Sequence, residues 1–381
     1  MSLRGKNILV LGLGETGLSM ARYAARCGAA RVCVADTRAA PPGSDDLRAS
    51  VPRATLLAGP FSPAIFAGVD LVAISPGVAL AEPAVQHAIA SGVEVVGDIE
   101  LFARALPEVG RPKVIAVTGT NGKSTVTALA GELCRALGLD CEVAGNISPA
   151  VLDALMRRED AGRMPEVWVL ELSSYQLETT ASLAADAAAM LNLSEDHLDR
   201  YRSIDEYGAA KARIFQGRGL QVLNRDDPAS MAMRIAGREC VTFGLEMAPR
   251  GDDFGLLESV TEYMLARGSE PIVEVGQLQL AGLHNAANAL AALALVSIFE
   301  PNRDALVTGL RRFRGLPHRV EPVGEADDVR YFDDSKGTNV GSTVAALDGF
   351  ARQLSARGGK VVLIAGGDGK GQDFTDRKSV V

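Results

Sequence analysis

The chain contains the sequence Val114-Ile-Ala-Val-Thr-Gly-Thr-Asn-Gly-Lys-Ser-Thr-Val-Thr-Ala-Leu-Ala-Gly-Glu-Leu133. The apolar run before the glycines predicts a buried strand, and the run after them predicts a helix. A Gly-rich turn in this setting lets backbone N–H groups and the positive end of the helix surround phosphate oxygens. Lys123 would add a mobile charge, and the hydroxyl of Ser124 could hold magnesium. We therefore expect ATP and Mg²⁺ to bind at Gly119, Thr120, Asn121, Gly122, Lys123, Ser124 and Thr125.

One position departs from the usual phosphate-loop pattern. That pattern has a glycine five residues before the Gly-Lys pair, whereas this chain has Val117 there. The turn is therefore interpreted as a shorter variant of the loop. The alternative from these residues alone is a Gly-rich connection between a strand and a helix that carries a solvated lysine.

The composition is typical of a globular enzyme. The chain has 381 residues, enough for two or three domains, of which 47% are hydrophobic, and its formal charge is −8. A net negative charge disfavours nucleic acid as a partner. No apolar stretch approaches the ~20 residues of a membrane span, and no signal-peptide core follows Met1. A cytoplasmic location without membrane association is therefore expected. The five cysteines form no C-x-x-C pair, which favours reduced thiols.

A second Gly-rich turn lies near the N-terminus. The apolar run Asn7–Leu11 predicts a strand, Gly12-Leu-Gly-Glu-Thr-Gly17 follows it, and residues 18–26 have a helical pattern. Another strand is predicted at Arg31–Ala35 and ends before Asp36. Together these segments predict a βαβ unit that can bind a nucleotide.

The N-terminal turn leaves three interpretations open. An acidic residue about 20 positions after the last glycine, here Asp36, is typical of NAD binding and of a dehydrogenase. The second phosphate site favours instead a nucleotide-linked substrate, because a simple dehydrogenase has no need of ATP. The third interpretation is a turn with a purely structural role.

Alternating strands and helices predict an α/β protein of three domains. Residues 1–106 are expected to form a Rossmann-like domain, and residues 107–314 a central P-loop ATPase-type domain with a mostly parallel sheet. Residues 315–381 are expected to form an incomplete Rossmann-like domain, because they hold little more than one βαβ unit. The last predicted strand, Lys360–Ala365, would leave a sheet edge prone to association. Residues 376–381 fit no preceding pattern and are interpreted as a non-native tail.

Several further elements are expected on the same grounds. Strands are predicted at residues 70–74, 93–96, 166–171, 187–193, 220–224 and 329–332, and helices at residues 285–297 and 341–354.

Motifs spread from residue 5 to about residue 375 resemble those of the Mur ligase family. They are Gly119–Thr125, Leu170-Glu-Leu-Ser-Ser-Tyr-Gln176, Glu195-Asp-His-Leu-Asp-Arg200, Gly282-Leu-His-Asn-Ala-Ala-Asn288, Gly315-Leu-Pro-His-Arg319 and Asp334-Ser-Lys-Gly-Thr-Asn339. The last string and the opening Gly-Leu-Gly-x-Thr-Gly are similar to members that add D-glutamate to UDP-N-acetylmuramoyl-L-alanine in peptidoglycan synthesis. Sister ligases and folylpolyglutamate synthases carry different residues at that string.

The resemblance implies an amide ligase. Such enzymes transfer the γ-phosphate of ATP to a substrate carboxylate, and an amine then displaces phosphate from the acyl phosphate. The catalytic residues would be Lys123, His197, Lys211 and Lys336. The magnesium ligands would be Ser124, Glu171, His197 and Lys211, the last as a carbamate. The residues alone also allow a helix cap for Glu171, a structural histidine for His197 and a solvated lysine for Lys211.

The resemblance also implies a set of binding residues. ATP would further contact Asn285, Asn288, Arg319 and Asp334, although helix capping is an alternative for the two asparagines. The uridine-linked substrate would contact Thr16, Asp36, Thr37, Arg38, Gly77, Asn146 and Ser173. The amino-acid end would involve Lys336, Thr338, Asp368 and Lys370, with a surface turn as the alternative for the last two.

The expected partners are small molecules. UDP-N-acetylmuramoyl-L-alanine and D-glutamate would bind to a monomer. Because the family draws further amino-acid contacts from sequence beyond residue 375, the chain is expected to be inactive or nearly so. Another Mur-type or folylpolyglutamate-type ligase is one alternative. A nucleotide-binding fragment that keeps both sites without catalysis is an alternative of a different class.

Overall fold

The computed structural model describes residues 3–197, 200–258, 262–280, 282–337, 339–355 and 359–366. By its contacts the chain divides into two compact units that interleave along the sequence. Unit 1 comprises Met1–Val114, Glu142–Ala185 and Asp205–Arg218, and unit 2 comprises Ile115–Cys141, Asp186–Ile204 and Gly219–Val381. Thr338, Asp368, Lys370 and the predicted tail 376–381 lie outside the described residues.

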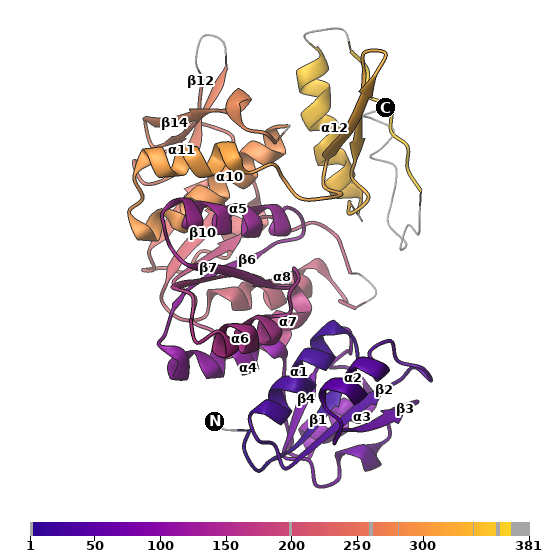
Figure 1. Cartoon of the computed structure of the whole chain (residues 1–381). Coiled ribbons are helices and arrows are strands. Elements are labelled where there is room, and N and C mark those ends of the chain that lie inside the picture. Colours follow the sequence, from indigo (N-terminus) through magenta and orange to yellow (C-terminus); the bar gives the residue numbers. More distant parts are fainter. Residues whose placement is uncertain are drawn as a thin grey trace. The chain divides into compact units, whose positions relative to one another are not determined.

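Unit 1 contains the predicted nucleotide-binding sheet. Its strands follow the order β3 (Thr55–Ala58), β2 (Arg31–Asp36), β1 (Asn7–Leu11), β4 (Leu71–Ile74) and β5 (Glu94–Val96), and all neighbours are parallel (Figure 1). This order is that of a doubly wound sheet. The helices that alternate with these strands are α1 (Glu15–Arg26), α2 (Ser44–Ser50), α3 (Pro83–Ala90) and α4 (Asp98–Ala105). The residues of β1 from Ile8 onward and all of β4 are buried, as expected for central parallel strands.

The turn between β1 and α1 is tightly packed. Gly12 has φ +86°, and a Cβ atom on Gly17 would lie 1.8 Å from the carbonyl oxygen of Gly12. Gly14, between them, has no atom within 4 Å of its Cβ position. Two of the three motif glycines are therefore required by close approach or by backbone conformation.

The rest of unit 1 comes from later in the chain. It contains β8 (Val167–Glu171), helices α6 (Val151–Asp160) and α7 (Ser174–Glu178), and nearly all of β7 (Cys141–Gly145) and α8 (Ile204–Ala212). Trp168 on β8 is fully buried, and its ring packs edge-on against Phe102 of α4, with the ring centroids 4.9 Å apart.

Ion pairs join α1 to α6 on the surface of unit 1. Arg22 pairs with Asp153, and Arg26 pairs with Glu159 and Asp160.

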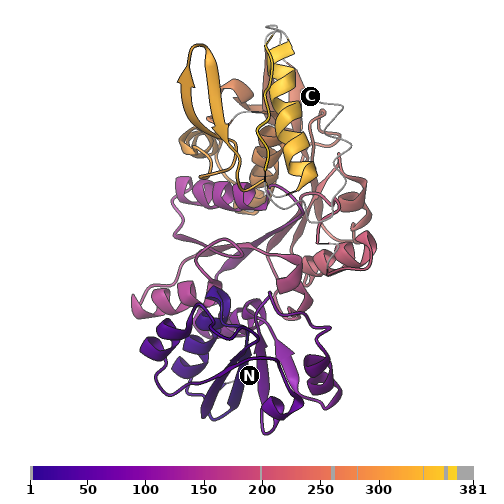
Figure 2. The ribbon, with the colours of Figure 1, turned by 90° about the vertical axis from the view of Figure 1, so that its right-hand side faces the viewer.

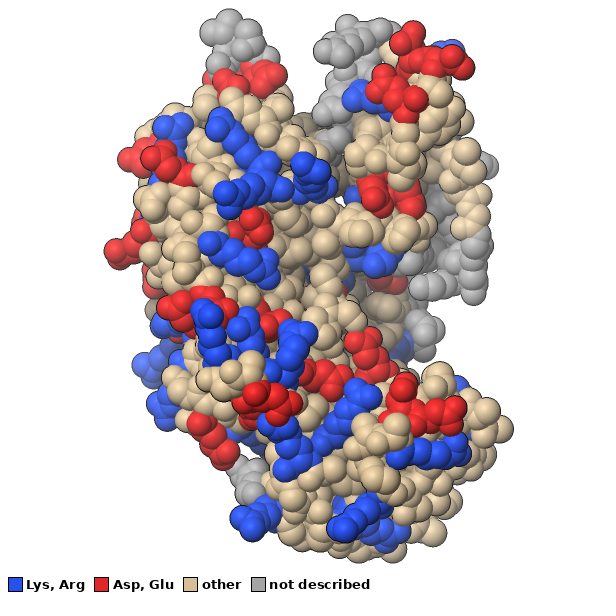
Figure 3. Space-filling model, viewed as in Figure 1, with Lys and Arg blue, Asp and Glu red and all other residues tan. Residues whose placement is uncertain are grey.

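On the face of the molecule in Figure 3, basic and acidic side chains are mixed over the surface. No described helix is both long and apolar enough to cross a membrane.

Unit 2 contains most of β6 (Lys113–Thr118), which leads into the phosphate loop, and strands that come later in the chain. Their order is β14 (Glu270–Glu274), β13 (Tyr263–Arg267), β12 (Phe254–Glu258), β11 (Cys240–Phe243), β10 (Leu220–Asn224), β9 (Ala187–Met190) and β6. The strands from β6 to β12 pair in parallel, whereas β12, β13 and β14 form an antiparallel meander. Helix α10 (Leu283–Val296) packs against α5 (Lys123–Ala136), which also contacts α11 (Arg303–Arg312).

Residues after α11 form a hairpin and a helix. Strands β15 (Glu321–Ala326) and β16 (Val329–Asp333) pair antiparallel, and α12 (Val340–Ser355) lies beside them (Figures 1 and 2). Phe332 of β16 contacts Phe350 of α12, with ring centroids 4.6 Å apart.

The strand predicted at Lys360–Ala365 is wrong. Residues 359–366 have no regular secondary structure, and the side chains of Val362 and Ile364 are 85% and 92% exposed. An apolar run forms a strand only where a neighbouring edge pairs its backbone groups. The sheet of β15 and β16 includes no third strand among the described residues.

Candidate functional site

Unit 1 has a cavity of about 430 Å³ that is lined in part by its Gly-rich turn. It opens where β1, β2 and β4 end, which is where parallel sheets bind nucleotides. It includes six of the seven residues predicted for the uridine-linked substrate. The lining is Gly12, Gly14, Glu15, Thr16, Asp36, Thr37, Arg38, Phe61, Ser75, Pro76, Gly77, Val78, Gly145, Asn146, Ser148, Ala150 and Gln176.

Asp36 organises one side of this cavity. Its Oδ1 accepts hydrogen bonds from the backbone N–H and the Nε of Arg38, at 2.9 and 2.8 Å. Its Oδ2 accepts from Nη2 of Arg38 and from the N–H of Leu13, both at 2.7 Å. The hydrogen bonds from the Arg38 guanidinium are the main reason that the pKa of Asp36 is lowered to about 2.

This geometry bears on the NAD interpretation. A carboxylate has about four lone-pair positions, and hydrogen bonds from Arg38 and Leu13 already use that number on Asp36. A ribose hydroxyl would have to displace Arg38 to reach the carboxylate. The arrangement favours instead a ligand whose negative charge meets the fixed guanidinium.

Asn146 and Glu171 meet at the ends of β7 and β8. The Nδ2 of Asn146 donates to Oε1 of Glu171 at 2.5 Å, and its backbone N–H donates to the Glu171 carbonyl at 2.8 Å. Glu171 is buried, and its Oε2 has no hydrogen-bond partner among the described residues. The helix-cap interpretation of Glu171 is wrong, because Ser173 caps α7 in a capping box with Gln176.

The side chain of Gln176 is a feature that the sequence reasoning missed. It lines the cavity, whereas the predicted residue Ser173 does not. Its Oε1 accepts from the N–H of Ser173 at 3.1 Å, and its Nε2 donates to Oδ2 of Asp98 at 3.0 Å. Asp98 is fully buried, and burial is the main reason that its pKa is raised to about 6. Because Asp98 accepts from the Nε2 of Gln176, the Oε1 of that amide is left to accept from Ser173.

Unit 2 has a cavity of about 290 Å³ at the phosphate loop. It brings together predicted ATP-binding residues from four separate segments, together with His197 and Lys336. The lining is Thr120, Asn121, Gly122, Lys123, Thr125, Leu191, Asn192, Asp196, His197, Asn224, Phe243, His284, Asn285, Ala287, Asn288, Arg319, Val320, Asp334, Lys336, Gly337, Asn339, Ser342 and Ala346.

The loop itself has the shape of a phosphate cradle. Gly122 has φ +83°, and α5 begins at Lys123. The Nζ of Lys123 donates to the carbonyl of Thr120 at 2.8 Å. The positive end of a 14-residue helix therefore faces the turn, as phosphate binding requires.

The side chain of Asn192 is hydrogen-bonded to the phosphate loop. It exchanges hydrogen bonds with the backbone of Asn121, accepting from its N–H at 2.8 Å and donating to its carbonyl at 3.1 Å. The sequence placed Asn192 inside a strand at 187–193, but β9 ends at Met190. A polar residue within an otherwise apolar run was the available signal for a loop position after a parallel strand.

Helix α10 approaches the loop through its first turns. A Cβ atom on Gly122 would lie 2.5 Å from Oδ1 of Asn288, and Nδ2 of Asn288 donates to Oδ1 of Asn285 at 3.1 Å. The residue at the N-cap is Gly282, which has no side chain to cap the helix. Neither asparagine is the N-cap residue, and their role in binding ATP stays a prediction.

The segment after α11 also contributes to the cavity wall, and two of its residues are predicted to bind ATP. The Nη2 of Arg319 donates to Oγ of Ser124 at 2.9 Å. Oδ1 of Asp334 accepts from the N–H of Val320 at 3.2 Å, and burial raises the pKa of this carboxyl. The cavity lining thus includes two cations, Lys123 and Arg319, and the carboxyl group of Asp334.

The predicted metal ligands are divided between the units. Ser124 and His197 belong to unit 2, whereas Glu171 and Lys211 belong to unit 1, so this ligand set stays a prediction. Lys211 is only 1% exposed, and its Nζ lies 4.5 Å from the centre of the Tyr207 ring. The interpretation of Lys211 as a solvated helix lysine is therefore wrong.

Two family models and many curated relatives match this chain. The family models "Mur ligase MurD-like, N-terminal domain" and "Mur ligase middle domain" match residues 6–97 and 117–296. A relative from Nitrosospira multiformis is 54% identical over 379 residues, which cover 98% of this chain and 78% of the relative. The chain belongs to the Mur ligase family. The match to the MurD-like model places this Mur ligase in that branch.

Curated relatives of this Mur ligase share one name. The protein from Nitrosospira multiformis is named UDP-N-acetylmuramoylalanine--D-glutamate ligase. The protein from Thiobacillus denitrificans has the same name and is 53% identical, covering 100% of this chain and 81% of the relative.

Solved structures of other Mur ligases share the fold. UDP-N-acetylmuramate-alanine ligase from Thermotoga maritima has a TM-score of 0.58 at 21% identity, over 92% of this chain and 78% of that one. A UDP-N-acetylmuramate:L-alanyl-gamma-D-glutamyl-meso-diaminopimelate ligase from Neisseria meningitides has a TM-score of 0.57 at 17% identity, over 82% of this chain and 99% of that one. The predicted Mur ligase architecture is thereby confirmed.

Proposed function

We propose that this Mur ligase joins D-glutamate to UDP-N-acetylmuramoyl-L-alanine and hydrolyses ATP to ADP and phosphate. The observation that carries the proposal is the shared name of relatives that are 53–54% identical over 98–100% of the chain. The two cavities support it, because one suits a uridine-linked substrate and the other suits a nucleoside triphosphate. The product would be a peptidoglycan precursor, made in the cytoplasm by a monomer.

The first step is phosphoryl transfer in the unit 2 cavity. An oxygen of the substrate carboxylate attacks the γ-phosphorus, and the bond from that phosphorus to the ADP oxygen breaks. Both reactants are anionic, so cations must offset their repulsion. Lys123 and Arg319 line the cavity at the phosphate loop and provide that charge.

The second step forms the amide. The amine of D-glutamate attacks the acyl carbon, phosphate leaves with the electron pair of the broken bond, and the proton of the amine passes to the released phosphate. Lys336 lines the same cavity as Arg319 and is proposed to face the incoming amino acid. Thr338 is proposed to face the amino acid as well, and Asp368 and Lys370 are proposed to contact its far end.

Glu171 has the chemistry of a magnesium ligand. The buried Oε2 of Glu171 is an anionic oxygen without a partner among the described residues, as a hard cation prefers. Ser124, His197 and a carbamylated Lys211 are the other proposed ligands. When bound, the ion would neutralise charge on the phosphate oxygens.

The uridine diphosphate is proposed to occupy the cavity of unit 1. Arg38 is held in place by Asp36 and can meet a diphosphate without further ordering. Thr16, Thr37, Gly77 and Asn146 line the same cavity, and Ser173 lies one turn from Gln176, which does so too.

Phosphate release with a panel of D- and L-amino acids tests the proposal. The assay contains ATP, Mg²⁺ and UDP-N-acetylmuramoyl-L-alanine, and a high enzyme concentration makes slow turnover measurable. Release that depends on the uridine substrate and is greatest with D-glutamate is expected. A preference for another amino acid would overturn the assignment. Binding of both nucleotides without release, and without exchange of phosphate into ATP, would favour a non-catalytic binding protein.

A further inference from the structure

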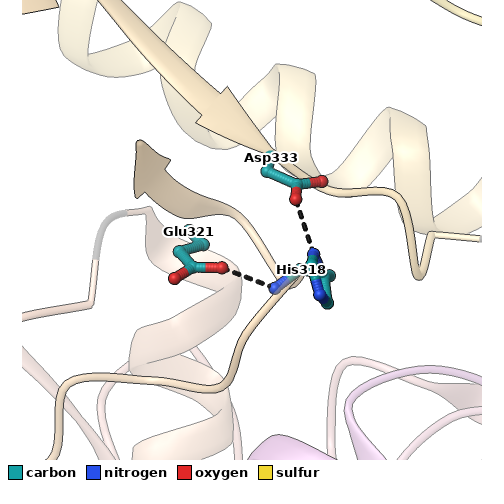
Figure 4. Close-up of side chains that lie close together, drawn as sticks. All are labelled: His318, Glu321 and Asp333. Carbon is teal, nitrogen blue, oxygen red and sulfur yellow. Dashed lines mark hydrogen bonds and ion pairs between the residues drawn. The ribbon is translucent and has the colours of Figure 1, made fainter. Parts of the chain in front are cut away.

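Three side chains meet at the turn that carries Arg319 (Figure 4). His318 and Glu321 lie on either side of that residue, and Asp333 is the last residue of β16. The Nδ1 of His318 lies 2.6 Å from Oδ2 of Asp333, and the backbone N–H of His318 donates to Oε2 of Glu321 at 2.8 Å. Glu321 begins β15 and Asp333 ends β16, so His318 is hydrogen-bonded to both ends of the hairpin.

The backbone of this turn is strained. His318 and Val320 have φ values of +63° and +50°. L-residues rarely adopt this left-handed region, and a β-branched residue such as Val320 is an outlier there. Arg319 lies between these two residues. The direction of its side chain therefore depends on an unfavourable backbone conformation, which other contacts must stabilise.

Other hydrogen bonds attach the same turn to the start of the Asp334–Gly337 segment. The N–H of Lys336 donates to the carbonyl of His318 at 3.1 Å, and the N–H of Val320 donates to Oδ1 of Asp334 at 3.2 Å. The N–H of Ser335 donates to Oδ1 of Asp333 at 2.9 Å. Asp333 thus connects His318 to the segment that carries Asp334 and Lys336.

We propose that the His318–Asp333 hydrogen bond is a positioning device for Arg319. It holds the left-handed turn so that the guanidinium stays at the mouth of the phosphate loop, 2.9 Å from Oγ of Ser124. His318 itself is absent from the cavity lining, whereas Arg319 is part of it, so His318 acts through its neighbour. The inference rests on the proposed function in one respect: the cavity must bind ATP.

The same three side chains have the composition of a metal site, since their ligand atoms lie within 4.8 Å of one another. Their present contacts favour the positioning role. The Nδ1 of His318 and Oδ2 of Asp333 face each other, and Oε2 of Glu321 accepts a backbone N–H. A cation would have to break both contacts, and breaking them would release the turn.

Two substitutions of His318 separate the positioning role from a general structural one. In His318→Asn the side-chain amide can take the place of Nδ1, and asparagine tolerates positive φ better than most residues. In His318→Gln the amide lies one bond further along the side chain, so it does not take the place of Nδ1, the atom that contacts Asp333. ATP affinity is measured by calorimetry in Mg²⁺. It should fall about tenfold in His318→Gln, roughly the effect of one charge-assisted hydrogen bond, and by less than about threefold in His318→Asn.

A double-variant cycle with Arg319→Ala tests whether His318 acts through Arg319. In the Arg319→Ala background, His318→Gln should cause no further loss of ATP affinity, because contacting residues that act together are not additive. A full additional loss in that background would overturn the proposal, as would an equal loss in His318→Asn and His318→Gln. The exposed His87 of α3 provides the matched control His87→Gln.

Two outcomes distinguish this inference from the proposed function. If the unsubstituted chain binds UDP but not ATP, the proposed function of unit 2 fails. If that chain binds ATP and His318→Gln binds it equally well, only the positioning role fails. Affinity for UDP, which is measured in every variant, should stay constant because the proposed UDP site lies in unit 1.

Discussion

The Nη2 atom of Arg319 lies 2.9 Å from the Oγ atom of Ser124, although 195 residues separate the two in the chain. Ser124 is in the first turn of α5, directly after the lysine of the phosphate loop. The contact places a second cation at the phosphate loop, and we propose that it meets the terminal phosphates of ATP. It also occupies the hydroxyl proposed as a magnesium ligand, so nucleotide and metal should rearrange it.

Arg319→Ala is expected to weaken ATP more than AMP. Loss of a charge-assisted contact to phosphate costs about 1.5–3 kcal/mol, which is roughly tenfold to a hundredfold in affinity. AMP lacks the terminal phosphates and should lose little. Arg319→Lys should recover part of the ATP affinity, because lysine keeps the charge without the planar fork. Calorimetric titration with both nucleotides measures the difference, and equal losses would show that Arg319 does not face the terminal phosphates.

UDP, and not NADH, is expected to protect the chain from thermal unfolding. A ligand at a hundred times its dissociation constant stabilises the folded state by about 2.7 kcal/mol. The carboxylate of Asp36 is already saturated by Arg38 and Leu13, so it has no acceptor left for a ribose. Scanning calorimetry with each ligand measures the effect. Arg38→Ala should abolish most of the protection by UDP, and protection by NADH would restore the dehydrogenase interpretation.

Asp98→Asn is expected to stabilise the chain at neutral pH. The pKa of Asp98 is raised to about 6 by burial, so the folded state favours the protonated carboxyl. Stability from this group is fully present below the unfolded pKa near 3.8 and is lost as pH rises through 6. The cost above pH 6 is about 3 kcal/mol, which asparagine avoids while still accepting from Gln176.

Urea unfolding at several pH values checks this expectation. The advantage of Asp98→Asn should be largest at pH 7 to 8 and should shrink towards pH 4. Asp45→Asn is the matched control, because the Asp45 side chain is 96% exposed and should change stability by less than about 0.5 kcal/mol. An advantage that is the same at pH 4 and pH 8 would show that the charge of Asp98 is not its cause.

The sequence predicts the parallel strands of this chain well, because their signal is local. The runs at Asn7–Leu11 and Leu220–Asn224 are strands with the predicted bounds. Central parallel strands are buried on both faces, so a continuous apolar run is enough to identify them. The phosphate loop was equally clear, since its glycines and Lys123 are adjacent in the sequence.

Features that depend on distant partners were missed. The strand predicted at Lys360–Ala365 has the right composition but no described neighbour to pair with. Asn192 and Gln176 acquire their roles from Asn121 and Asp98, which lie 71 and 78 residues away along the chain. No local pattern records such a pairing. A buried carboxylate such as Asp98 looks like an ordinary first-turn acid until the tertiary structure surrounds it.

The crowding at Gly17 limits how this gene can change over time. In a pooled library selected for UDP binding, only glycine should survive at codon 17, because any β-carbon collides with a main-chain oxygen. Codon 14 should accept alanine, since open space surrounds that position. Two glycines of one short motif would then differ in mutational tolerance, and the difference would come from packing alone.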